Sequence, residues 1–210
     1  MKSKIAFLLF CMISMRIMSQ DQVQTFIKEA QEFYTLKNYK QAQMSLQDAI
    51  NELNKLMSGQ VADILPAEIN GLKAVDGGST NTAAMGMMGG GMQISKRYEF
   101  PGKKENEADI QIIANSPMMN AMNMYMSNPS LMGQGAKSVR VGTQRAILKS
   151  EMQDFYDDNG VSKKIRSTQI QIPLGQTLIT IEAKGFATEQ DELAFAAKLD
   201  IAKIKAAVGE

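Results

Sequence analysis

The chain contains no histidine and no tryptophan, and its one cysteine, Cys11, lies within the first twenty residues. The lack of histidine removes the commonest general base of enzymes and the commonest metal ligand. With no cysteine after residue 11 either, the usual catalytic triads and zinc sites cannot form in the rest of the chain. We therefore predict a protein that is not an enzyme.

The chain also lacks an excess of charge of either sign. Its 210 residues include 23 basic and 22 acidic side chains, and 44% of the residues are apolar. This near-neutral balance gives no electrostatic footprint for nucleic acid, so we expect no nucleic-acid partner. The basic run Lys163, Lys164 and Arg166 has no aromatic platform beside it, and we interpret it as a solvated strand end.

The first nineteen residues have the layout of a secretory signal peptide. A basic start precedes the apolar run 5–13, and the small residue Ser19 offers a cleavage site. Arg16 interrupts the apolar stretch, which is too short for a permanent membrane span. We predict cleavage after Ser19 and a periplasmic or secreted protein, with an uncleaved N-terminal anchor as the alternative.

Cleavage would change the composition of the mature protein. The signal peptide contains three of the 23 basic residues, so 20 basic residues would face 22 acidic ones, for a net charge of −2. The only cysteine would be lost with it, so no disulfide could form.

Residues 20–58 are predicted to form a helical hairpin with a turn at 36–38. The second helix carries an apolar stripe at helical spacing, made of Tyr39, Ala42, Leu46, Ala49, Ile50 and Leu53. The segment resembles a single tetratricopeptide repeat in its large, small and aromatic positions, which are Phe26, Ala30, Phe33, Tyr39, Ala42, Leu46 and Ala49. Asn54 replaces the closing proline of that family, and there is no second copy. Arrays of this kind need about three repeats, so we expect one hairpin docked on the rest of the chain. A peptide-binding groove is the alternative.

Residues 62–210 are predicted to form an α+β domain. A short helix at 64–66 and a turn lead into the first strand near residue 72. Alternating apolar and polar residues predict further strands at 92–100, at 108–114 after a polar loop, at 139–148 (one strand, or two broken at Gly142), at 162–172 and at 176–184. Helices are expected at 117–127 and at 188–207. Thr188 is the predicted N-cap of the second helix, which carries Leu193, Ala197 and Ile204 on one face. The order β-β-β-α-β-β-β-α favours a mainly antiparallel sheet with helices packed on it.

Part of this domain resembles a family of uncharacterised exported bacterial proteins. The resemblance covers about residues 64–205 and rests on four features: Leu65-Pro66 followed by Gly71, the first long hairpin, Asn115-Ser116-Pro117-Met118 and Ser127-Asn128-Pro129. Leu72 stands where that family usually has tryptophan. The resemblance implies export and an α+β fold, and it implies no activity.

Methionine is the one residue type present in excess. Thirteen of the 17 methionines follow the signal peptide, and ten of these lie between Met85 and Met132. Met118, Met122 and Met126 are one helical turn apart, and thioethers bind Cu(I) and Ag(I). They are the candidate metal ligands of a periplasmic Cu(I)/Ag(I)-binding protein. The alternative, which we favour, is that methionine fills irregular gaps in packing and binds apolar partners.

The function predicted from the sequence is that of a non-catalytic exported envelope protein that binds another protein or an apolar ligand, without a cofactor. The predicted contact surface combines a flexible Gly/Met-rich loop at 77–91 with the helix 117–127, because an uncharged, sulfur-rich surface is costly to expose without a use.

Overall fold

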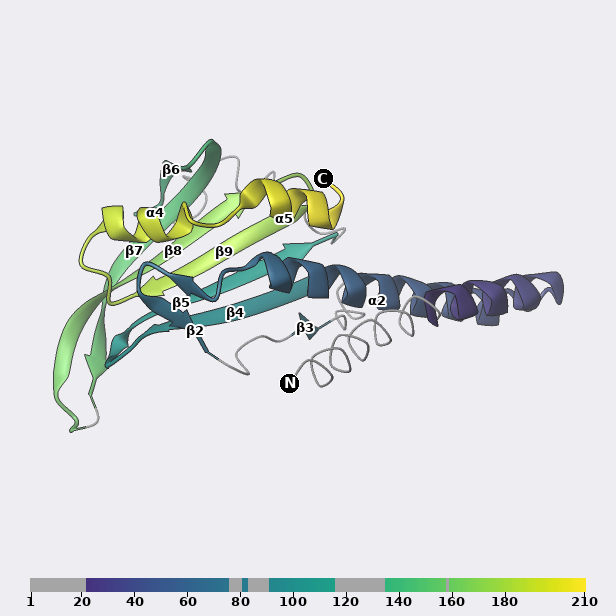
Figure 1. The fold of residues 1–210 in the computed structure, drawn as a ribbon, viewed down its shortest axis with the longest axis horizontal. Coiled ribbons are helices and arrows are strands. Elements are labelled where there is room, and N and C mark those ends of the chain that lie inside the picture. The colour runs from purple at the N-terminus through teal and green to yellow at the C-terminus, as the bar shows by residue number, and fades with distance from the viewer. Residues whose placement is uncertain (1–21, 76–80, 83–90, 116–134, 158) are drawn as a thin grey trace, which may run out of the picture. The chain divides into compact units, whose positions relative to one another are not determined.

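The computed structural model describes residues 22–75, 81–82, 91–115, 135–157 and 159–210. The chain divides into two compact units that meet between Met57 and Ser58. The first unit is helical. The second contains an antiparallel sheet with helices packed on it (Figure 1). This confirms the predicted α+β class and the predicted N-terminal hairpin.

The first unit consists of a helix over 22–35, a turn at 36–38 and the start of α2 (Tyr39–Ile64). Lys37 adopts a left-handed φ of 58°, and the Asn38 N–H donates to the Phe33 carbonyl at 2.8 Å, which closes the first helix. The side chains buried in this unit include several small ones: Ala30, Ala42, Ser45 and Ala49. Small side chains allow two helices to approach closely, so these residues form the seam of the hairpin.

The α2 helix is longer than the sequence predicts. The expected end near residue 57 and the separate short helix at 64–66 are both wrong, because α2 continues to Ile64. Its last turns belong to the second unit. There Ser58, Val61 and Leu65 recur at helical spacing and are almost completely buried. Burial of this face stabilises turns that have no strong helical preference of their own.

Nine strands of the described residues form one antiparallel sheet in the order β1-β2-β4-β5-β9-β8-β7-β6, with β3 beside β4. Two runs of consecutive strands, β1 to β5 and β6 to β9, are joined where β5 pairs with β9. The strands are β1 (Glu68–Ile69), β2 (Leu72–Ala74), β3 (Asn81–Thr82), β4 (Met92–Phe100), β5 (Lys103–Ala114), β6 (Lys137–Val141), β7 (Gln144–Tyr156), β8 (Ser162–Pro173) and β9 (Thr177–Lys184).

The hairpins agree with the sequence in position and differ from it in length. The strands predicted at 162–172 and 176–184 are β8 and β9, and the strand predicted at 139–148 is two strands, β6 and β7, broken at Gly142. The predicted polar loop before residue 108 is wrong, since β5 begins at Lys103 directly after the turn Pro101–Gly102. Glu107 explains the longer strand, because it forms ion pairs with Arg97 on β4 and Lys184 on β9.

The predicted C-terminal helix is two helices, α4 (Glu189–Ala196) and α5 (Ile201–Val208). Thr188 caps α4 as expected, and its hydroxyl accepts from the Asp191 N–H at 3.2 Å. Asp200 caps α5 in the same way, accepting from the Lys203 N–H at 3.0 Å. Ala197 is the C-cap of α4 and is exposed, so it does not share a buried face with Ile204.

The main core lies between the helices and one face of the sheet. Alternate residues of β4, β5, β8 and β9 point to this face and are fully buried, among them Ile94, Ile110, Ile112, Ile170, Ile172, Ile179 and Ile181. Tyr98 and Phe195 of α4 meet edge to face with their ring centroids 5.7 Å apart. This contact places α4 on the sheet, as Figure 1 shows.

Two polar groups of β4 attach the end of α2 to this core. The Tyr98 hydroxyl donates to the Pro66 carbonyl and the Lys96 ammonium donates to the Leu65 carbonyl, both at 2.8 Å. Lys96 otherwise interrupts an apolar face. Burial lowers its pKa, and the nearby Asp63 opposes that shift. Its position near the carboxyl end of a helix suits a cation.

Candidate functional site

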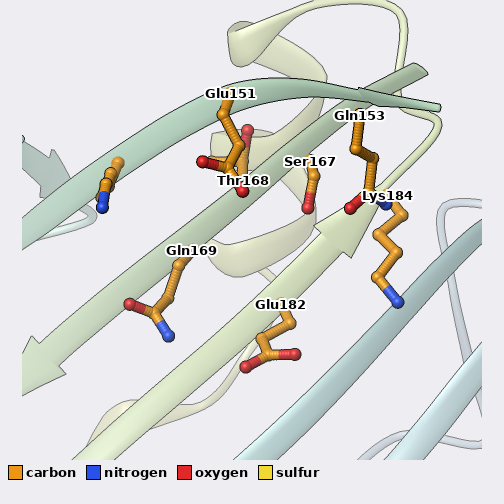
Figure 2. A pocket seen from close by; sticks show the side chains of 8 residues that line it. Glu151, Gln153, Ser167, Thr168, Gln169, Glu182 and Lys184 are labelled. Carbon is orange, nitrogen blue, oxygen red and sulfur yellow. The ribbon is translucent and has the colours of Figure 1, made fainter. Parts of the chain in front are cut away.

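The face of the sheet opposite α4 and α5 is polar. Successive side chains of a strand point to opposite faces, so the strands that bury isoleucines on one side present hydroxyl, amide and charged groups on the other. This face includes a small apolar cluster, in which Ile113 and Ala136 pack against the buried Ile147 and Leu178. Beside this cluster the face forms a hollow of about 340 Å³ lined by residues of β7, β8 and β9 (Figure 2).

The register arranges six of the lining residues in two rows across the three strands. The rows are Lys149–Gln169–Glu182 and Glu151–Ser167–Lys184. Neighbouring strands are about 4.8 Å apart, and residues two positions apart along a strand are separated by roughly 7 Å. The four charged residues thus form a rectangle on β7 and β9, in which each residue has neighbours of the opposite charge. The neutral Gln169 and Ser167 lie between them on the central strand, β8.

The charges around the hollow are only partly paired. The Lys184 ammonium donates to Glu107 on β5 at 2.8 Å. Lys149 and Glu151 form no ion pair with any residue that the structure describes. Asp109 is the register partner of Glu182. Its pKa is raised mainly by burial and further by Glu107 and Glu182, while Arg97 and Lys184 oppose the shift.

These groups can bind a polar ligand through donors and acceptors. Within the described ranges, no set of three or more His, Cys, Asp or Glu side chains could hold a metal ion. The hollow is not predictable from the sequence, although the polar alternation of each strand is visible there. The register that brings the three strands together could not be deduced from one strand at a time.

On the other face of the sheet, a buried polar network attaches α4. The Glu192 carboxylate is fully buried and accepts from Arg166 Nε at 2.8 Å and from the Thr168 hydroxyl at 2.7 Å. The hydroxyls of Thr168 and Ser150 are 2.7 Å apart, and Arg166 also lies 3.5 Å from Glu189. The interpretation of Arg166 as part of a solvated strand end is therefore wrong, and its role is to anchor a helix.

The other two members of that basic run are also paired. The Lys163 ammonium lies 2.6 Å from Glu105 and the Lys164 ammonium 3.2 Å from Asp154. Both lysines are exposed, so only this part of the interpretation agrees with the structure.

No family model, curated protein or solved structure matches this chain. The two resemblances drawn from the sequence therefore stay predictions. The candidate copper ligands Met118, Met122 and Met126 lie outside the described residues, as does the helix 117–127. The predicted loop 77–91 lies outside them except for residues 81–82 and 91. Among the helices that the structure describes, none is both long enough and apolar enough to cross a membrane.

The first unit has an exposed apolar surface, whereas the sequence predicted that this hairpin docks on the rest of the chain. The large residues of the predicted α2 stripe are exposed, whereas its alanines are buried in the hairpin seam. Leu46, Ile50 and Leu53 retain between 45% and 50% of their accessible surface. Their spacing of four and three residues places them on one line along the helix.

This line continues onto the first helix. The rings of Tyr34 and Tyr39 meet across the turn, with centroids 5.8 Å apart. Ile27 precedes Tyr34 by seven residues and Leu46 follows Tyr39 by seven, so the regular rise of a helix brings both to the same distance from the turn. We call this surface the hairpin stripe; its members are Ile27, Tyr34, Tyr39, Leu46, Ile50 and Leu53, all exposed.

Proposed function

We propose that this chain is a non-catalytic binding protein, exported to the cell envelope, whose hairpin stripe receives an amphipathic helix of a partner protein. The observation that carries the proposal is the exposure of six large apolar side chains on one hairpin, with small side chains in the seam beneath them. Apolar patches of this kind mark interaction surfaces in soluble proteins.

The shape of the stripe favours a helix as the bound element. Its α2 members recur at the i, i+4 and i+7 positions, which is the spacing that complements the apolar face of a second helix. Residues 22–57 contain four lysines and four acidic residues. A neutral hairpin selects a partner by apolar contact and shape, without a preference for charge.

The expected energy is sufficient for specific binding. Complete burial of a Leu or Ile side chain contributes about 1.5–3 kcal/mol. Leu46, Ile50 and Leu53 are about half exposed, so covering all three adds roughly 3 kcal/mol, a factor of about 100 in affinity. The two tyrosines add contact area at low entropic cost.

The test is photo-crosslinking from position 50 in the host envelope, followed by affinity measurements with the purified partner. We expect the double variant Leu46→Gln/Ile50→Gln, which removes two of these three side chains, to bind about 30-fold more weakly than the wild type. Met44→Gln is the matched control, because Met44 is equally exposed and points away from the stripe. Equal weakening by both variants, or by neither, would refute the site. An adduct with a second copy of this chain would refute the proposed partner.

Export has its own test. Intact mass analysis of the protein recovered from its host should give a chain that begins at Gln20. A chain that retains residues 1–19 and stays with the membrane would contradict the proposed cleavage and support the N-terminal anchor.

A further inference from the structure

Two arginines face each other across the β6–β7 hairpin. Arg140 and Arg145 are register partners on either side of the two-residue turn Gly142–Thr143. Both are exposed, and alternation along the strands places them on the polar face of the sheet. Directly opposite side chains have Cβ atoms about 5 Å apart, and like charges in such a pair destabilise the hairpin.

The surroundings do not neutralise this pair. The sequence contains no acidic residue from 110 to 150, whereas the same stretch carries Lys137, Arg140, Arg145 and Lys149. Lys137 pairs with Glu189 of α4 at 2.6 Å. The other three cations form no ion pair with any residue in the described parts of the chain.

A hollow of about 470 Å³ lies over the two arginines. It is lined by Ser138, Val139, Arg140, Thr143 and Arg145. Arg145 Nε donates to the Ser138 hydroxyl at 3.1 Å, which fixes one guanidinium at the edge of the hollow. The lining therefore offers two guanidinium forks and two hydroxyls, and none of its residues is acidic.

From these observations we propose that the β6–β7 hairpin binds a phosphate-type oxyanion between Arg140 and Arg145. A phosphate monoester carries nearly two negative charges at neutral pH. Planar guanidinium groups bind such an anion through paired hydrogen bonds. The hollow is larger than one phosphate group, so it leaves room for the molecule that carries the phosphate. Lys149, on the same face of β7, extends the positive charge along the sheet.

The first measurement follows the arginine side chains directly. The chain from residue 20 to 210 is titrated with inorganic phosphate at constant ionic strength, and the arginine Nε–H signals are recorded by NMR. We expect saturable shifts for Arg140 and Arg145. Arg97, which is already paired with Glu99 and Glu107, should not shift. Equal shifts of all three signals, or no saturation, would overturn the proposal.

Variants separate a specific site from general attraction. Arg145→Gln should weaken phosphate binding at least tenfold, because it removes charge-assisted hydrogen bonds. Lys198→Gln removes the same charge from an exposed position outside this hairpin and should leave binding unchanged. Without phosphate, Arg145→Gln should melt at or above the wild-type temperature, since it relieves a like-charge contact. A lower melting temperature would mean that the arginine pair stabilises the fold, which would contradict its assignment as an anion-binding site.

The source of the phosphate is decided by vesicle binding. Arginine-dependent binding to phosphatidylglycerol vesicles, and not to phosphatidylcholine vesicles, would identify a lipid headgroup as the ligand. Saturable binding of free phosphate without vesicle binding would identify a soluble phosphate ester. Binding to neither probe would refute the site.

Discussion

Glu192 offers the sharpest test of how the second unit is held together. Its carboxylate is fully buried. One oxygen accepts hydrogen bonds from both Arg166 and Thr168, while the other has no hydrogen-bond partner in the described structure. Removing one member of a buried charge pair costs about 3–5 kcal/mol, because the remaining charge is left without compensation. Arg166 retains 26% of its side-chain exposure and lies near Glu189. We therefore expect the lower end of that range, about 3 kcal/mol, for Glu192→Ala.

Denaturant titration followed by far-UV circular dichroism measures this loss. For a protein of this size it corresponds to a fall in Tm of about 6–12 °C. Glu192→Gln should lose less, about 1–2 kcal/mol, since its carbonyl can still accept from Arg166 and Thr168. Glu189→Ala is the matched control on the same helix. Glu189 is 31% exposed, so its removal should cost no more than about 1 kcal/mol.

The result that would refute this reasoning is a cost below about 1 kcal/mol for Glu192→Ala. Such a value would mean that apolar contacts, such as that between Phe195 and Tyr98, are sufficient to hold α4 on the sheet. A cost for Glu189→Ala as large as that for Glu192→Ala would also refute the argument from burial, since a partly exposed carboxylate would then contribute as much as a fully buried one.

Three further predictions concern single groups and the methionines. The pKa of Asp109 is raised in the folded state, so the ionised carboxylate destabilises the fold at pH 7. Asp109→Asn should therefore be more stable than the wild type at pH 7. Equilibrium unfolding should show the difference in stability between the two proteins vanishing below the ordinary pKa of 3.8. Burial raises the pKa of Tyr98 to about 12. Tyr98→Phe should cost about 1 kcal/mol at pH 7 through the lost hydrogen bond to the Pro66 carbonyl. Denaturant titrations should show this deficit shrinking as the pH rises from 10 to 12, because the wild type loses stability over that range while the variant does not. Replacing Met118, Met122 and Met126 by leucine should not change the number of copper ions seen by native mass spectrometry in the presence of Cu(I). Integer copper adducts on the wild type that are absent from the variant would instead assign the protein to the metal-binding class.

The parts of the fold that depend on residues close together in the sequence were predictable. Alternation along 162–172 and 176–184 located β8 and β9 within one residue at each end. The cap at Thr188 and the turn at 36–38 depend on a few consecutive side chains, and both were identified correctly. Local physical chemistry is sufficient for such elements.

The parts that depend on distant residues were not predictable. The lengths of β5 and α2 follow from partners elsewhere, such as the ion pair between Glu107 and Lys184, which are 77 residues apart. Neither the polar hollow nor the buried pair of Arg166 and Glu192 exists until the strands are in register. The hairpin stripe was missed for a different reason, because helical periodicity cannot distinguish an apolar face that packs from one that stays exposed.

The joint between β5 and β9 has a consequence for assembly. Each of the two meanders, β1 to β5 and β6 to β9, contains only pairings between strands close in the sequence. The β5–β9 joint, with eight ladder pairs, instead connects residues 63 to 77 positions apart. Closing so long a loop carries an entropic cost that local hairpins avoid, so the joint should form last during folding. Until it forms, each meander exposes an unpaired edge that fits the complementary meander of any copy of the chain. At high concentration the topology is therefore open to exchange of halves between two molecules, and a domain-swapped dimer is the misassembled form to expect.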